Sequence, residues 1–227
     1  MATVNEIYAF VDQLAPFSYQ MSFDNAGFLV GRGGRQVTRI LVSLDITEEV
    51  VREASEWKAE LIGSHHPVIF HPARSVNVQD PTGRILLALA EDGIAAVCAH
   101  TNLDAVAGGV NDALARAVGL TEIEMLQTSG VDENGAPYGI GRVGVLKGKA
   151  VVTLADYAAQ VKTALQANGV RYVDAGRPVR RVAVGGGACG DLMGDALTQG
   201  CDTFITSDVK YNGFLDARAL GLNLIDA

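Results

Sequence analysis

The most informative stretch of the sequence is Ala59-Glu60-Leu61-Ile62-Gly63-Ser64-His65-His66-Pro67, in which a short apolar segment runs directly into two adjacent histidines. A related pattern, His100-Thr101-Asn102-Leu103-Asp104, follows the next apolar segment. Imidazole nitrogens and carboxylate oxygens are donors that divalent metal ions prefer in proteins. The plain alternative is that His65 and His66 form hydrogen bonds within a loop. Four donors at equivalent strand ends favour a metal site.

Predicted strands and helices alternate through the first half of the chain. The predicted strands are Arg39–Asp45, Leu61–Gly63 and Ile94–Ala99, and the first of them is expected to be buried. The helices between them are Glu48–Lys58 and Pro81–Asp92. An amphipathic helix capped by Thr3 precedes all of these elements. Strands that alternate with helices of this length indicate a parallel sheet with right-handed crossovers. The histidines and Asp104 then follow the carboxyl ends of strands, the edge at which open α/β sheets bind ligands.

The second half repeats the first in weaker form. Arg39–Val42 aligns with Arg181–Val184, and Ala59–Ser64 aligns with Cys201–Thr206. We therefore predict an α/β protein of two related βαβ halves that form sheets flanked by helices, although chance similarity between two α/β units is an open alternative. The last strand, Leu222–Ile225, corresponds to Ile94–Ala99, so further donors are expected beyond Ala227.

The segment between the halves has its own pattern. Tyr138–Val145 and Lys147–Val152 predict a hairpin, and Thr153 caps a following helix. These elements predict a smaller middle layer or lid. We therefore predict two domains. Residues 1–120 form the first α/β half with His65, His66, His100 and Asp104. Residues 121–227 form the middle layer plus a second half, which we expect to be truncated at its C-terminus.

Composition limits the possible classes of protein. Lys and Arg total 18 against 26 for Asp and Glu, and the net charge of -8 makes a nucleic-acid partner unlikely on electrostatic grounds. The N-terminus lacks the pattern of a secretory signal, and no apolar stretch reaches the roughly 20 residues of a membrane span. Three cysteines without CxxC spacing suggest reduced thiols. We expect a cytoplasmic protein without a membrane partner.

The motifs, taken in order, resemble one known family over nearly the whole chain. They are Asp24-Asn25-Ala26-Gly27-Phe28-Leu29-Val30-Gly31, Leu44-Asp45-Ile46-Thr47, Ser64-His65-His66-Pro67-Val68-Ile69-Phe70, His100-Thr101-Asn102-Leu103-Asp104, Gly139-Ile140-Gly141-Arg142, Gly185-Gly186-Gly187 and Asp208-Val209-Lys210-Tyr211. They are similar to the motifs of dinuclear-metal-centre proteins labelled GTP cyclohydrolase 1 type 2 homologues, also called the Ngg-interacting-factor-three-like family.

The resemblance implies a homo-oligomer, a toroidal hexamer, with two divalent ions per subunit. It implies that His65 and His66 bind different ions and that Asp104 binds one of them. The metal identity stays open among Zn, Fe, Mn, Ni and Mg. Relatives supply a further histidine and a bridging glutamate from a Gly-His-x-x-x-Glu segment, which is expected after Ala227 and is absent. Asn212 stands where many relatives carry histidine.

Three functions are compatible with this set of residues. The first is a dinuclear metal-dependent hydrolase in which a bridging water attacks carbon or phosphorus. The family label implies a small-molecule substrate such as a nucleotide. The reaction that it implies is opening of the guanine imidazole ring of GTP. The second is a non-catalytic metal-binding ring scaffold or regulatory interaction protein. The third is a mononuclear phosphoesterase.

Individual residues receive more specific predictions. His100 is the candidate catalytic residue, as general acid or base or by orienting Asp104, with a loop hydrogen bond as the alternative. Asp45, three residues before Glu48, fits a helix cap. Asp24 and Asn25 fit a turn. His65, His66 and Asp104 are expected to converge on one cavity at the carboxyl edge of the sheet.

Overall fold

A computed structural model describes residues 1–147 and 152–227 of the chain. The chain folds into two compact units, Met1–Leu103 and Asp104–Ala227. This boundary lies before the predicted one at residue 120, because helix α5 (Val110–Ala117) packs against strands of the second unit. Ala115 of α5 is fully buried in the core of that unit. None of the described helices is long and apolar enough to cross a membrane.

The first unit is built on a four-stranded sheet in the order β2-β6-β5-β4. Its strands are β2 (Gly27–Val30), β4 (Ile40–Ser43), β5 (Leu61–Ser64) and β6 (Ala95–Cys98). β4, β5 and β6 are parallel, which confirms the prediction from the alternating pattern. β2 pairs antiparallel with β6. A separate two-stranded sheet joins β1 (Ala2–Thr3) to β3 (Gln36–Val37).

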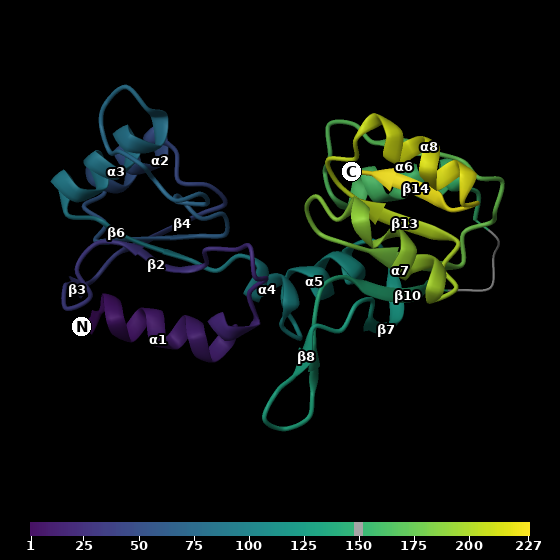
Figure 1. The fold of residues 1–227 in the computed structure, drawn as a ribbon, viewed down its shortest axis with the longest axis horizontal. Helices are drawn as coiled ribbons and strands as arrows, with labels where there is room; N and C mark the ends of the chain where they lie inside the picture. Colours follow the sequence, from purple (N-terminus) through teal and green to yellow (C-terminus); the bar gives the residue numbers. More distant parts are fainter. Residues whose placement is uncertain (148–151) are drawn as a thin grey trace. The chain divides into compact units, whose positions relative to one another are not determined.

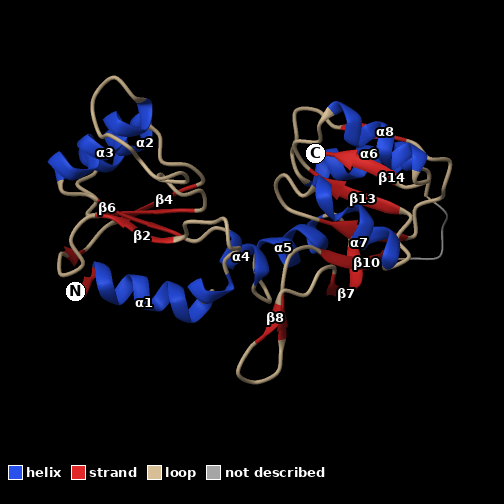
Figure 2. Ribbon diagram, viewed as in Figure 1, coloured by secondary structure: helices blue, strands red, loops and turns tan. Residues whose placement is uncertain are grey.

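Helices cover both faces of this sheet (Figures 1 and 2). α1 (Val4–Leu14) lies on one face, while α2 (Glu48–Glu56) and α3 (Pro81–Asp92) lie on the other. Thr3 caps α1 in a reciprocal capping box with Glu6, as predicted. Each face buries its own apolar cluster: Val4 packs with Leu61 and Val97 under α1, whereas Leu41 and Ile62 pack under α2 and α3.

β4 differs from the fully buried strand that its apolar run predicted. Leu41 is 7% exposed, but its neighbour Val42 is 81% exposed. Val42 is exposed because β4 lies at the edge of the sheet. The apolar cluster beneath α1 contains residues of β5 and β6 but none of β4. One face of β4 is therefore core and the other is open.

Glu60 fixes the start of β4 against the start of β5. Its carboxylate accepts hydrogen bonds from the backbone N–H groups of Thr38 and Arg39, both at 2.9 Å, and from the Thr38 hydroxyl. These hydrogen bonds, those from the backbone first, lower the pKa of Glu60 to about 2. The carboxylate is thus ionised at neutral pH and holds the register of the two strands.

We predict that Glu60→Gln lowers the melting temperature at pH 7, because the amide is a weaker acceptor than the carboxylate. The folded-state pKa lies below the unfolded one, so the contribution is complete above pH about 4.5 and is lost as the pH falls toward 2. The gap in melting temperature between wild type and variant should therefore narrow from pH 7 to pH 3. Glu56→Gln, at the exposed end of α2, is the control; an unchanged gap would contradict the prediction.

The second unit contains a six-stranded sheet in the order β11-β14-β13-β12-β10-β7. Its strands are β7 (Leu120–Met125), β10 (Arg142–Leu146), β11 (Arg171–Val173), β12 (Arg181–Val184), β13 (Thr203–Thr206) and β14 (Asn223–Asp226). β12, β13 and β14 are parallel, as the internal repeat predicted. The core joins these strands to α5 and to α6 (Leu154–Ala164). α7 (Met193–Thr198) and α8 (Tyr211–Ala219) contact β13 and β14.

The middle segment is part of this sheet and not a separate layer. β10 pairs with β7 and β12, where the sequence predicted a hairpin with Lys147–Val152. Residues 148–151 of that predicted partner lie outside the described residues. The hairpin that does form joins β8 (Gly130–Val131) to β9 (Pro137–Tyr138), and it extends away from the sheet (Figure 1). α6 begins after the predicted cap, Thr153.

Arg142 is a buried cation in the second unit. Its side chain is 3% exposed, and Nη2 lies 2.7 Å from the carboxylate of Asp112. Nη1 donates to the carbonyls of Gly139 and Gly141, and Nη2 donates to that of Val106. One guanidinium therefore ties the start of β10 to the chain between α4 (Thr101–Ala105) and α5.

We predict that Arg142→Met destabilises the protein by about 3–5 kcal/mol, because it leaves the carboxylate of Asp112 buried without its main partner. Arg116→Ala is the matched control, since Arg116 pairs with the same carboxylate at 3.8 Å but is 62% exposed. That change should cost about 0–1 kcal/mol. Denaturant unfolding measures both values, and equal losses would contradict the assignment.

Candidate metal centre

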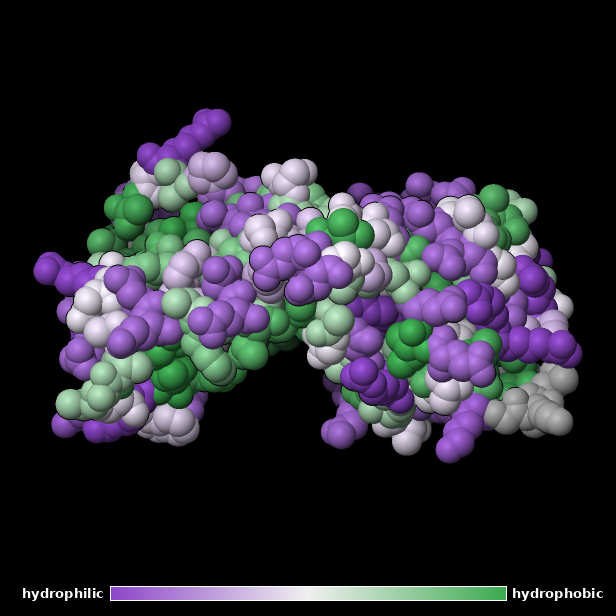
Figure 3. Space-filling model, turned by 90° about the horizontal axis from the view of Figure 1, so that it is seen from below, coloured by the Kyte–Doolittle hydropathy of each residue, from purple (hydrophilic) through white to green (hydrophobic). Residues whose placement is uncertain are grey.

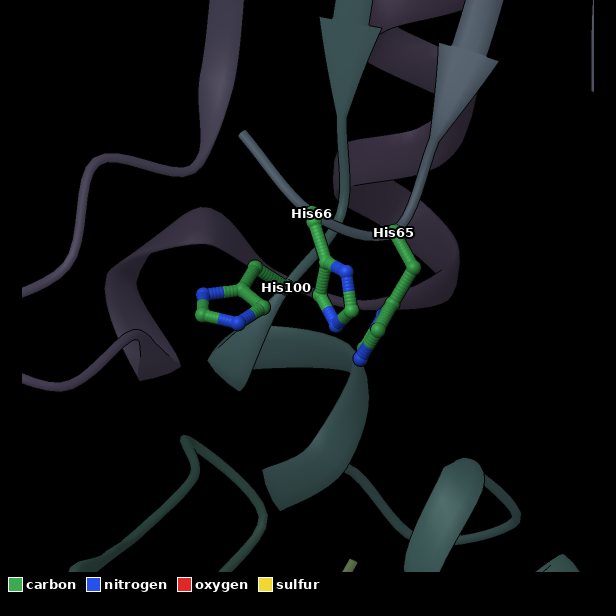
Figure 4. Close-up of side chains that lie close together, drawn as sticks. All are labelled: His65, His66 and His100. Carbon is green, nitrogen blue, oxygen red and sulfur yellow. The ribbon is translucent and has the colours of Figure 1, made fainter. Parts of the chain in front are cut away.

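Three histidines meet at the carboxyl ends of β5 and β6. His65 and His66 follow β5 directly, and His100 follows β6 by two residues. The two strands are parallel neighbours with Ser64 opposite Cys98, so the chain leaves both strands at the same edge of the sheet. Figure 4 shows the three side chains extending from the ends of these two strands into one region.

The imidazoles are close enough to share an ion. One ring nitrogen from each of His65, His66 and His100 lies within 4.8 Å of the other two. The ring centroids are 5.1 Å apart for His65 and His66, 5.2 Å for His65 and His100, and 5.6 Å for His66 and His100. Three donors converging from two segments is the arrangement of a catalytic zinc-type site, which keeps a position for water or substrate.

Each imidazole is oriented through the same ring nitrogen. Nδ1 of His65 lies 2.8 Å from the carbonyl oxygen of Ala99, Nδ1 of His66 lies 2.7 Å from Asp45, and Nδ1 of His100 lies 2.8 Å from Asp24. These oxygens accept hydrogen bonds, so Nδ1 is the protonated nitrogen and the lone pair is on Nε2. Histidines that bind metals are held in this way by carboxylates and backbone carbonyls. Nε2 is therefore the ring nitrogen of each histidine that could bind a metal ion.

Asp24 is the most constrained of these acceptors. Its side chain is fully buried and accepts hydrogen bonds from the backbone N–H of Thr101 at 3.0 Å, from the Thr101 hydroxyl and from the N–H of Asn25 at 2.7 Å. Burial by itself raises the pKa of Asp24, but the hydrogen bonds from Thr101, His100 and Asn25 together bring it below its ordinary value. An ionised, buried carboxylate therefore holds His100. The turn predicted for Asp24 is present, and it places the carboxylate beside Nδ1 of His100.

Asp45 corrects one prediction. The N-cap of α2 is Thr47, whose side chain accepts from the N–H of Val50, so Asp45 is not the cap. Its carboxylate is instead 2.7 Å from Nδ1 of His66, with side chains 55% and 44% exposed respectively. A carboxylate can accept a hydrogen bond either from the first turn of a helix or from a histidine ring. The sequence alone therefore does not distinguish these two roles for Asp45.

The environment keeps His65 in the form that binds metals. Burial lowers the pKa of His65, and the neighbouring imidazoles of His100 and His66 act in the same direction. Neutral imidazole is the metal ligand, whereas imidazolium is not. The site thus favours the neutral form of His65 at neutral pH.

Hydrogen bonds from neighbouring side chains set the backbone of the cluster. The Ser64 hydroxyl donates to the carbonyl of His66 at 2.8 Å. Asn102 is fully buried, donates to the carbonyl of Ala15 and accepts from the N–H of His100 at 2.9 Å. The functional interpretation of the sequence missed Thr101 and Asn102 as supports, although both lie within the motif that contains His100.

Asp104 belongs to the second unit, at the end of α4. It is 8% exposed, and Asn111 donates to its backbone carbonyl at 3.1 Å. The structure brings His100 to His65 and His66; the convergence of Asp104 with them stays a prediction. The roles assigned to His65, His66 and Asp104 as ligands and to His100 as catalytic residue also stay predictions.

The donor set fits a divalent metal ion. Three imidazole nitrogens, each from a ring oriented by a hydrogen bond, suit Zn, Fe, Ni and related ions better than Mg, which prefers oxygen. The fold and this site define the class: a mixed α/β protein with a histidine cluster able to hold a metal at the carboxyl edge of a parallel sheet.

The chain belongs to the Duf34/NIF3 (NGG1p interacting factor 3) family, whose model matches residues 2–227. A GTP cyclohydrolase 1 type 2 homolog of Clostridium perfringens is 35% identical over 98% of this chain and 84% of its own length. Another from Streptomyces coelicolor is 34% identical, over 100% and 80%.

Solved structures show the same fold. A Bacillus cereus protein related to NIF3 superposes with a TM-score of 0.91 at 25% identity, covering 99% of this chain and 87% of its own. A Staphylococcus aureus hypothetical protein superposes with a TM-score of 0.90 at 32% identity, covering 99% and 85%. The family resemblance and the fold class expected from the sequence are thus confirmed.

We predict that Asp24→Asn weakens zinc binding by about 10–100-fold, because a neutral amide replaces the buried carboxylate that orients His100. Asp45→Asn should weaken binding less, since the Asp45–His66 pair is half exposed and solvent screens it. Competition with a chelating dye measures both affinities, and circular dichroism confirms that each variant is folded. Equal affinities for wild type and Asp24→Asn would contradict this role.

Proposed function

We propose that this protein is a divalent-metal-dependent hydrolase whose centre includes His65, His66 and His100. The observation that carries the proposal is that all three Nδ1 atoms lie within hydrogen-bond distance of acceptors, while one ring nitrogen of each histidine lies within 4.8 Å of those of the other two. A cluster of histidines packed only for structural reasons does not require three matching tautomers. Family membership supports the same interpretation.

The residues of the chain have separate tasks in this proposal. A divalent ion bound here would supply activation of water near neutral pH. His65, His66 and His100 would hold the ion, and Asp24 and Asp45 would keep a proton on Nδ1 of His100 and His66. Burial of His65 keeps that ring neutral, so it does not repel a cation.

The finer part of the proposal is a dinuclear centre. Three imidazoles suit one ion with an open position, and a second ion requires further donors. Asp104, four residues after His100 on the adjoining helix, is the carboxylate that we propose for this purpose. In that arrangement His100 is either a third nitrogen ligand or a general acid or base beside the ions.

The substrate class is proposed from the relatives. Curated relatives carry the name GTP cyclohydrolase 1 type 2 homolog, so GTP is the first substrate to test. We propose a small phosphorylated or nucleotide-like electrophile. Hydrolysis is the reaction class because activation of water is what such a metal centre provides.

The test uses all four histidines of the chain. We expect elemental analysis to find at least one divalent ion per wild-type chain, and His65→Ala, His66→Ala and His100→Ala to reduce this content. His71→Ala is the matched control, because His71 is exposed and outside the cluster. Loss of hydrolysis with metal retained in His100→Ala would identify it as acid or base. Absence of metal from wild type, or equal loss in His71→Ala, would overturn the proposal.

A further inference from the structure

A cavity lies beside His66 in the first unit. Its volume is about 480 Å³, a size typical of small-molecule sites, and His66 and Asp45 form part of its wall. The rest of the wall comes from the first turn of α2, the chain on either side of it and the start of α3. All of these segments belong to the first unit. The cavity therefore adjoins the histidine cluster within one compact unit.

Part of the wall is apolar and continuous with the core. Ile46 lines the cavity and is 6% exposed, as a member of the cluster beneath α2 and α3. Val68 and Ile85 also line it, and both are partly buried against the same cluster. A flat, uncharged ring placed against this wall would remove apolar surface from water.

Asp45 supplies a hydrogen-bond acceptor next to the apolar wall. Its Oδ1 lies 2.7 Å from Nδ1 of His66, and none of the described residues donates a hydrogen bond to its Oδ2. The side chain is 55% exposed, so Oδ2 is available to a ligand. Glu48, which also lines the cavity, is already paired with Arg84 at 2.8 Å. Asp45 thus has the carboxylate oxygen that can select a ligand by its N–H groups.

The cavity is unsuited to a phosphate group. None of the lysines and arginines in the described part of the chain lines it, whereas Asp45, Glu48 and Glu49 do. The positive end of a helix dipole usually attracts anions, and α2 begins here. That end is already satisfied, because Thr47 caps it and Glu48 and Glu49 lie in its first turn. A phosphate would meet negative charge without a cation to offset it.

The carboxylates of this cavity do not gather into a metal site either. Within the described ranges, His65, His66 and His100 are the group whose ligand atoms come close enough together to hold an ion. The cavity therefore offers an apolar wall beside one uncommitted acceptor. That combination selects an uncharged ring that carries N–H groups, because the ring covers the wall and an N–H group pairs with the carboxylate.

A second cavity of the first unit provides a contrast. It adjoins His65, has a volume of about 410 Å³ and is lined mostly by apolar residues of α1 and of the sheet, such as Val11, Leu14 and Val97. Figure 3 looks at this side of the molecule and shows apolar residues gathered on the first unit. No carboxylate and no cation is among its described lining residues. It lacks the feature that selects a nitrogen-rich ligand, and it can serve as an internal control.

We propose that the cavity beside His66 binds the substrate through a nitrogen-rich heterocycle with N–H groups, and that Asp45 determines this specificity. The inference rests on the proposed function, whose substrate it describes more closely. The ring covers the apolar wall, and one of its N–H groups donates to Oδ2 of Asp45. Any phosphate of the substrate extends out of the cavity, away from the glutamates in the first turn of α2. Asp45 then positions both His66 and the heterocycle, which lies beside the metal centre.

The test uses isoleucine-methyl NMR of the full chain, with and without zinc, and guanosine as a heterocyclic probe without phosphate. We expect the methyl resonances of Ile46 and Ile85 to shift in a saturable way, and those of Ile7 and Ile40 in the second cavity to stay unchanged. Inosine lacks the exocyclic amino group and should bind about tenfold more weakly. Ribose 5-phosphate should shift none of these resonances. Equal affinities for guanosine and inosine, or equal shifts with ribose 5-phosphate, would overturn the ligand class.

A matched pair of variants tests the place of binding. Thr82→Trp should weaken guanosine binding by about tenfold or more, because Thr82 lines the cavity and an indole would occupy the space that the ring needs. Ala90→Trp, at an exposed position of the same helix, should bind guanosine like wild type. Equal binding by the two variants would overturn the site.

Metal content separates this proposal from the proposed function. Both tryptophan variants should keep the zinc content of wild type, since neither residue belongs to the histidine cluster. Zinc binding by wild type without a guanosine response at Ile46 and Ile85 would overturn the cavity and leave the metal centre intact. A guanosine response at these two residues in a chain that binds no zinc would support the cavity and overturn the metal-dependent function.

Discussion

The parallel register of β5 and β6 is the constraint on which the site depends. Because Ser64 lies opposite Cys98, two segments more than thirty residues apart leave the sheet side by side, and their histidines meet. A shift of this register by one residue would turn the apolar side chains of β5 away from their core faces. The same hydrophobic pattern that forms the core thus places the imidazoles, and the core and the site are specified together.

The hydrogen bonds around the histidines convert proximity into a defined donor set. Asp24 shows how the fold supports this, since its buried carboxylate joins the turn before β2 to the motif that follows β6. Burying that charge without partners would cost several kcal/mol, and the four hydrogen-bond donors offset the cost. The first unit therefore buries a charged carboxylate, at a cost in free energy, in a position where it orients one imidazole. A binding site gives a reason for this arrangement, whereas a loop without a function does not.

The parallel strands and the meeting of His65, His66 and His100 follow from patterns that are local in the sequence. Apolar runs, helix caps and histidines at strand ends each involve only a few neighbouring residues, so the three parallel strands of each unit could be predicted. The exposure of Val42 and the place of β10 between β7 and β12 depend on which elements pack together in the fold, and no local pattern carries that information. The prediction that Asp45 caps α2 was wrong for a further reason. Its spacing from Glu48 fits a helix cap, but the neighbouring Thr47 is the residue that caps the helix.

We propose that three histidines bind a divalent ion through Nε2 while their Nδ1 atoms stay protonated. Long-range ¹H–¹⁵N NMR of the histidine rings, recorded during titration with zinc, is the most direct test. We expect the Nε2 resonances of His65, His66 and His100 to shift on binding, their Nδ1 resonances to remain those of protonated nitrogen, and His71 to stay unchanged. Coordination through Nδ1, or a response confined to His71, would contradict it.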